Sequence, residues 1–166
     1  MANKLKEKFP TLSRAGLGTA QFTMAYGFTP PLRQSVAHKL LDACYEEGIN
    51  FLDTARAYGD SEEIIGAYLA GNPKKKFYVA TKLGNTPRHI DENRIIDHVD
   101  GLIRRSCTGL SANHIDMLLL HQLDESIMRN KYFWEAIDKF KERFTSFGIS
   151  VYETDTTETL LNEYGH

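Results

Sequence analysis

The stretch that decides the fold is GINFLDTARAYGDSEEIIG, residues 48–66. Its apolar residues Ile49–Leu52 predict a short buried strand. A polar loop follows, and Asp60 or Ser61 is suited to cap a helix whose apolar residues recur at helical spacing. If Asp60 is the cap, Glu63 can complete a capping box. The stretch therefore predicts a strand–loop–helix unit, from which parallel sheets are built.

The rest of the chain repeats this alternation of strand and helix. Strands are expected at 12–21, 49–52, 77–81, 115–120 and 144–151. Helices are expected from Ser35 to near Gly48, from Asp60 or Ser61 to Gly71, after Asp91, around 134–140 and around 160–164. The first helix should gather Val36, Leu40, Leu41 and Cys44 on one face. The pattern predicts an α/β fold with a parallel sheet.

The length limits how much of a barrel such a sheet can form. A parallel (β/α)8 barrel of the TIM type usually takes about 250 residues. The chain has 166 residues, too few for eight such units, so we expect about five βα units in a single domain spanning residues 1–166.

Composition narrows the class of protein further. Lys and Arg total 20 against 22 for Asp and Glu, which gives no electrostatic reason to expect nucleic acid as a partner. The two cysteines, Cys44 and Cys107, cannot form a secreted disulfide framework. The N-terminal MANKLKEKFP lacks the apolar stretch of a signal peptide, and no apolar run approaches membrane-spanning length. We therefore expect a soluble, cytoplasmic protein without a membrane partner.

Polar residues stand where four of the predicted strands end. Asp53, Lys82, His121 and Ser150 follow the second, third, fourth and fifth strands. Because the carboxyl ends of parallel strands converge on one rim, these side chains should meet there. Tyr58 lies in the loop after Asp53 and can reach the same rim.

These residue types suggest acid–base chemistry on a carbonyl group. A phenol has a pKa near 10 and is a poor acid at neutral pH, but a neighbouring ammonium lowers that pKa. Lys82 can play this part for Tyr58, and Asp53 can hold Lys82 in place. His121 can donate a hydrogen bond to a carbonyl oxygen. Together they would protonate a developing alkoxide while hydride arrives at the carbon.

The same residues carry a family resemblance. GINFLDTARAYGDSEEIIG, then VATKLG at 79–84 and IDMLLLHQ at 115–122, resemble the aldo-keto reductases in motif and in order. GLGTAQF at 16–22 resembles the first-strand glycine–threonine segment of that family. The resemblance runs from about Leu12 to the end of the chain. It implies a parallel (β/α)8 barrel of the TIM type, of which this chain would be the N-terminal part, a partial barrel of about five βα units.

The resemblance implies an activity and a set of site residues. The implied activity is NADPH-dependent reduction of a small aldehyde or ketone to an alcohol. The implied catalytic residues are Asp53, Tyr58, Lys82 and His121, with Tyr58 as the proton donor. The positions expected beside the nicotinamide are Gly18, Thr19, Asp53 and Ser150. Where the family commonly has Ser-Asn after the fifth strand, this chain has Ser150-Val151.

Other interpretations stay open at this point. Each rim residue has an ordinary structural role available, such as a turn cap or a buried histidine. A metal-dependent barrel would use Asp53, Glu62 and His121 as ligands. A non-catalytic binding or regulatory subunit would keep the fold without turnover. Because five units leave two open sheet edges, the chain could also self-associate through them or be an inactive fragment.

Overall fold

Five parallel strands form one sheet, in the order β1-β2-β3-β4-β5 along the sheet. They belong to a computed structural model, which describes residues 2–25, 28–84, 90–121, 127 and 129–151. The strands are β1 (Leu17–Gly18), β2 (Phe51–Asp53), β3 (Tyr78–Leu83), β4 (Ile115–His121) and β5 (Phe144–Ser150). The predicted parallel α/β sheet is confirmed, and it forms part of a (β/α)8-type barrel.

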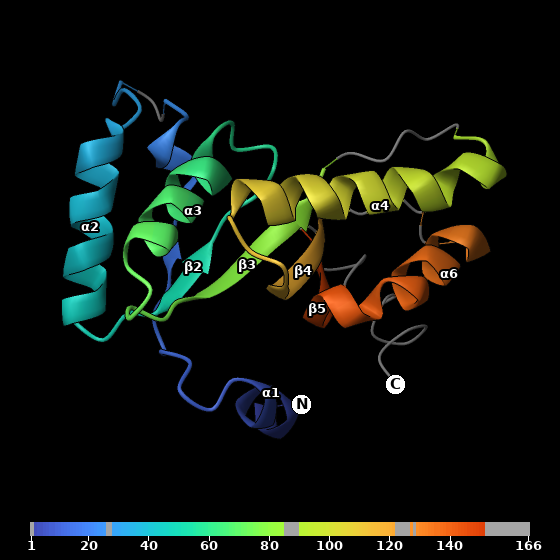
Figure 1. Ribbon diagram of the computed structural model, residues 1–166, viewed down its shortest axis with the longest axis horizontal. Coiled ribbons are helices and arrows are strands. Elements are labelled where there is room, and N and C mark those ends of the chain that lie inside the picture. Colours follow the sequence, from blue (N-terminus) through green and yellow to red (C-terminus); the bar gives the residue numbers. More distant parts are fainter. Residues whose placement is uncertain (1, 26–27, 85–89, 122–126, 128, 152–166) are drawn as a thin grey trace.

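Helices cover one face of this sheet. They are α2 (Gln34–Glu46), α3 (Ser61–Gly71), α4 (Glu92–Gly109) and α6 (Lys131–Lys139), and short 3₁₀ turns lie at η1 (Ala20–Phe22) and η2 (Lys141–Arg143). In Figure 1, α2 and α3 lie beside β2 and β3, while α4 and α6 lie together at the other end of the sheet. Two apolar clusters fill the space between the helices and the strands, one under α2 and α3 and one under α4 and α6. Among the described residues, no helix is long and apolar enough to cross a membrane.

The other face of the sheet, which becomes the barrel interior, is closed at the start of the strands by Phe9. This residue follows α1 (Ala2–Lys8), a helix that lies apart from the others at the lower edge of Figure 1. Phe9 is only 2% exposed and packs with Ala80 and Met117. Its ring meets that of Tyr78 edge-on at 5.3 Å. The sequence does not predict this helix, because the polar segment has no amphipathic pattern and is anchored by one residue.

Several predicted element boundaries differ from the structure. Ser35 was expected to cap α2, but the helix begins at Gln34 because the carbonyl of Arg33 already accepts hydrogen bonds from the N–H groups of Val36 and Ala37. Of the predicted apolar face, Leu41 and Cys44 are buried, whereas Val36 and Leu40 are 42% and 37% exposed.

The start of the second predicted unit also differs in detail. Asp60 does occupy the N-cap position of α3, but its side chain makes no capping hydrogen bond. Glu63 binds Arg56 in place of completing a capping box. In the predicted first strand only Leu17–Gly18 pairs with a neighbour. The expected last helix at 160–164 lies outside the described residues.

Candidate active site

The register of the sheet places five predicted site residues on one face. Gly18 pairs with Asp53, Lys82 pairs with Leu119, and His121 pairs with Ser150. Asp53 pairs with Ala80, two residues before Lys82, and Leu119 lies two residues before His121. Since paired residues and residues two apart share a face, all five point into the barrel interior near the carboxyl ends of the strands.

Lys82 and Asp53 form an ion pair at this rim. The Lys82 ammonium donates to Asp53 Oδ1 at 2.5 Å and to the carbonyl oxygen of Thr54 at 3.0 Å. The Lys82 side chain is 6% exposed and the Asp53 side chain 39%. A buried ammonium needs such partners to remain charged. The pair therefore fixes a positive charge at the mouth of the partial barrel.

Tyr58 lies over this charge on the loop between β2 and α3. Its hydroxyl is 3.5 Å from the Lys82 ammonium, which is also 5.0 Å from the centre of the Tyr58 ring. The loop is held by a hydrogen bond from the N–H of Tyr58 to the carbonyl of Ala55 and by the Thr23 hydroxyl, which donates to the carbonyl of Tyr58. These bonds fix the backbone from which the Tyr58 side chain extends.

His121 completes the group. Its ring meets the Tyr58 ring edge-on, with centroids 5.9 Å apart. Burial lowers the pKa of His121 below its usual value of 6.5, the Lys82 charge lowers it further, and Asp53 partly opposes them. The imidazole is therefore neutral at pH 7, a state with one donor and one acceptor nitrogen. We call Asp53, Tyr58, Lys82 and His121 the rim tetrad.

The residues expected beside a nicotinamide do not all face the rim. A side chain added at Gly18 would meet nothing within 4 Å, so this glycine leaves open space beside Asp53. Ser150 is half-buried on the same face. Thr19 is fully buried, and its hydroxyl binds the carbonyl of Asp53 at 3.0 Å and the Ser61 hydroxyl of α3 at 2.8 Å. The Thr19 side chain therefore joins β1 to β2 and α3, on the helix side of the sheet.

The structure also separates Glu62 from the other two residues of the metal hypothesis. Glu62 accepts a hydrogen bond at 2.6 Å from Thr81, which precedes Lys82 and therefore points to the opposite face. Within the described part of the chain, no three His, Cys, Asp or Glu side chains are grouped to hold a metal ion. The sequence does not predict that Glu62 and Arg56 contact each other. The one available signal is that Thr81 and Lys82 are adjacent in a strand, so one of these polar residues has to face the helices.

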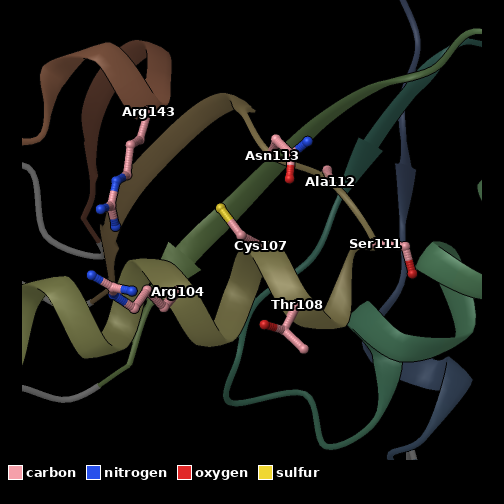
Figure 2. Close-up of a pocket in the computed structure, with 7 residues that line it drawn as sticks. All are labelled: Arg104, Cys107, Thr108, Ser111, Ala112, Asn113 and Arg143. Carbon is pink, nitrogen blue, oxygen red and sulfur yellow. The ribbon is translucent and has the colours of Figure 1, made fainter.

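A concave surface lies near the amino-terminal ends of β4 and β5, away from the rim. It is a pocket of about 450 Å³ lined by Arg104, Cys107, Thr108, Ser111, Ala112, Asn113 and Arg143. Figure 2 shows the guanidinium groups of Arg104 and Arg143 close together. Both arginines bind the carboxylate of Asp100, at 2.7 and 2.6 Å. The pair between Arg104 and Asp100 lies within α4, and the pair between Arg143 and Asp100 joins η2 to α4, so this pocket is part of the helix packing.

Comparisons with known proteins bear on this geometry. A family model described as the aldo/keto reductase family matches residues 14–165. The chain is 30% identical over 134 residues to D-arabinose 1-dehydrogenase of Saccharomyces cerevisiae, which covers 75% of this chain and 39% of that protein. It is 31% identical over 131 residues to norsolorinic acid reductase of Aspergillus flavus, covering 69% and 34%.

A solved structure gives a similar result. An aldo-keto reductase from Pseudomonas aeruginosa superposes with a TM-score of 0.73 at 27% identity, covering 92% of this chain and 60% of that one. The chain spans less than half the length of the two curated relatives.

Proposed function

The chain belongs to the aldo/keto reductase family of oxidoreductases, and on that premise we propose that it reduces a small aldehyde or ketone to an alcohol with NADPH. The observation that carries the proposal is the contact between the buried Lys82 ammonium, Asp53 and the Tyr58 hydroxyl. An ammonium held beside a phenol is an arrangement for donating a proton, because it stabilises the phenolate that remains.

Each member of the rim tetrad then has a part in the reaction. Hydride adds to the carbonyl carbon, the electron pair of the C=O π bond moves to oxygen, and that oxygen takes the proton of the Tyr58 hydroxyl. Lys82 stabilises the Tyr58 phenolate, and water later returns the proton. Asp53 and the Thr54 carbonyl hold Lys82. The neutral His121 donates a hydrogen bond that orients the carbonyl oxygen.

Residues at the carboxyl ends of β1, β2 and β5 suit the nicotinamide end of the cofactor. When bound, a nicotinamide cofactor supplies the hydride. The open space at Gly18, the partly exposed carboxylate of Asp53 and the half-buried Ser150 lie on the face that carries Lys82. We propose that these three residues contact the ring and its ribose, and that Thr19 keeps β1 in position for them.

A fluorescence titration of the purified chain with NADPH and with NADH tests cofactor binding. We expect saturable binding in the micromolar range, tighter for NADPH. Turnover is then followed by the loss of NADPH absorbance with 4-nitrobenzaldehyde as the carbonyl. Titration without saturation up to millimolar NADPH would contradict the proposal for this chain. Saturable binding without turnover would favour the non-catalytic subunit.

Tyr58→Phe tests the proton donor. Removing a general acid typically costs about 10²–10⁴ in rate, so kcat should fall at least about 100-fold. The affinity for NADPH should change little, because the hydroxyl faces the carbonyl substrate. A variant that keeps full turnover would remove Tyr58 from this role.

A further inference from the structure

Glu62 is a fully buried carboxylate that the proposed reaction does not use. It lies in the first turn of α3, is 0% exposed and faces the helix side of the sheet. A buried carboxylate is costly unless charged or hydrogen-bonding partners compensate for it. Its partners therefore indicate what it holds together.

One oxygen of Glu62 binds the strand that carries Lys82. Glu62 Oε1 accepts the hydroxyl hydrogen of Thr81 at 2.6 Å, and Thr81 is itself fully buried. Thr81 is the residue before Lys82, so this bond fixes the backbone from which the ammonium extends. A charged acceptor makes the bond stronger than one between neutral groups.

The other oxygen of Glu62 binds the loop that carries Tyr58. Arg56 donates through Nη1 to Glu62 Oε2 at 3.1 Å and through Nη2 to the carbonyl of Gly59 at 3.3 Å. Gly59 follows Tyr58 directly and adopts a positive φ of 55°. Arg56 therefore connects Glu62 to the residue next to the proposed proton donor.

The end of α4 packs against Glu62 and Arg56. A side chain at Gly109 would lie 3.0 Å from Cβ of Glu62 and 3.2 Å from Nη1 of Arg56. A side chain at Gly66 would lie 2.1 Å from the carbonyl oxygen of Gly109. The two helices thus meet at their glycine backbones, and this leaves Glu62 and Arg56 little room to rearrange.

We propose that Glu62 is a positioning residue, which sets the spacing between Lys82 and Tyr58 by binding Thr81 on one side and Arg56 on the other. The proposal rests on the proposed function, because it assigns Glu62 a part in the same proton transfer. The spacing is sensitive, since the Lys82 ammonium and the Tyr58 hydroxyl lie 3.5 Å apart, at the limit of a hydrogen bond.

Glu63 provides a matched control for Glu62. It also binds Arg56, at 2.5 Å, but its side chain is 44% exposed, and the bond to Thr81 belongs to Glu62. Glu62→Gln and Glu63→Gln each remove one negative charge beside the same arginine and keep the size of the side chain. Only the first removes a charged acceptor shared by the strand and the loop, since an amide offers one acceptor oxygen where the carboxylate of Glu62 offers two.

The kinetic test compares these two variants. A displacement of about 1 Å can cost about 100-fold in rate, so Glu62→Gln should lower kcat about 10- to 100-fold with the KM for the carbonyl within about twofold. Glu63→Gln should change kcat less than about twofold. In the Tyr58→Phe background, Glu62→Gln should lower the residual rate less than about twofold, because residues that act as a unit are not additive.

A second readout needs neither cofactor nor turnover. Labelling tyrosines with ¹³C at Cζ and assigning Tyr58 by loss of its resonance in Tyr58→Phe gives a probe of the phenol in the chain itself. Glu62→Gln should shift the Tyr58 resonance, and Glu63→Gln should leave it in place. Far-ultraviolet circular dichroism confirms that both variants are folded, and Glu62→Asp replaces Glu62→Gln if the latter is not.

The outcomes separate this proposal from the proposed function. An unmoved Tyr58 resonance in the folded Glu62 variant overturns the positioning role, whatever the rates. Additive losses in the double variant overturn it too, because they would mean that Glu62 does not act through Tyr58. If Tyr58→Phe keeps full turnover while the resonance of Tyr58 responds to Glu62, the proposed function fails and the positioning contact stands.

Discussion

In the described part of the chain, the same four residue types gather at two places. The rim tetrad lies at the carboxyl ends of the strands. A second group, which we call the outer tetrad, lies on α2, on α3 and in the loop before β3. It consists of His38, Asp42, Tyr68 and Lys75.

The two groups are alike in their distances. The lysine lies 2.5 Å from the aspartate in both. The ammonium is 3.5 Å from the tyrosine hydroxyl at the rim and 3.3 Å in the outer tetrad. The histidine and tyrosine rings meet edge-on in both, at 5.9 and 5.4 Å. These three distances alone would therefore not tell the two groups apart.

They differ in what accepts the proton of the tyrosine. In the outer tetrad the Tyr68 hydroxyl donates to Asp42 at 2.6 Å, and Tyr68 is 2% exposed. Burial raises the pKa of Tyr68, and Asp42 raises it further. The proton of Tyr68 is thus held inside the fold. At the rim, Asp53 binds the lysine, and the ammonium is not an acceptor for the proton of Tyr58. Acid chemistry here requires a phenol whose proton is not already bound by a carboxylate.

Substituting the two lysines tests this comparison with the largest expected effect. Lys82→Met removes the charge that stabilises the Tyr58 phenolate, so kcat should fall at least about 100-fold. Lys75→Met removes the corresponding charge of the outer tetrad and should leave kcat within about twofold. Steady-state rates of both variants on the same carbonyl substrate give the measurement. Equal losses would mean that the two groups do not differ in function.

The pH dependence of stability should also separate the two groups. The pKa of His121 is lowered, chiefly by burial, so between pH 6.5 and that lower value the unfolded chain binds more protons than the folded one. The contribution of His121 to stability is therefore complete above pH 6.5 and is lost as the pH falls through the folded-state pKa. The Tm measured from pH 7 to pH 5 should fall more in the parent chain than in His121→Asn.

The outer tetrad should change the stability of the fold in other pH ranges. Because burial and Asp42 raise the pKa of Tyr68 above 10, its contribution to stability is lost as the pH rises beyond that value. The hydrogen bond from Lys75 lowers the pKa of Asp42 below 3.8, so its contribution is lost as the pH falls below that value. Tyr68→Phe should flatten the alkaline fall in Tm and leave the change near pH 6 as it is. The reverse pattern would contradict these shifts.

The sequence predicts the rim better than the rest of the site, for a physical reason. Asp53 and His121 end apolar strands, and Lys82 lies one residue before the end of another. Parallel strands bring such ends together whatever the packing of the helices. The face of Thr19 depends on a single residue step at the end of a two-residue strand. The outer tetrad combines parts of three segments, and its contacts arise only when α2 packs on α3.

Glu62 illustrates the same limit. The sequence pattern predicts a capping box for its neighbour Glu63. Such a local pattern cannot show that the Arg56 side chain binds both glutamates. Phe9 likewise follows a polar helix, and only the sheet shows that its ring closes the barrel interior. Pairings between side chains far apart in the sequence or on different layers require the tertiary structure.

The smallest expected effect is on thermal stability, where the substitution of Tyr68 should lower the Tm more than the substitution of Tyr58. Tyr68→Phe removes a buried hydroxyl that binds Asp42 and should lower the Tm by about 2–4 °C, since one hydrogen bond contributes about 1 kcal/mol. Tyr58→Phe should leave the Tm nearly unchanged, because Lys82 keeps its bonds to Asp53 and to the Thr54 carbonyl. Thermal unfolding of both variants at pH 7 gives the comparison. If Tyr58→Phe were the more destabilising change, the rim hydroxyl would be a structural group like that of Tyr68, and its position over Lys82 would no longer argue for proton donation.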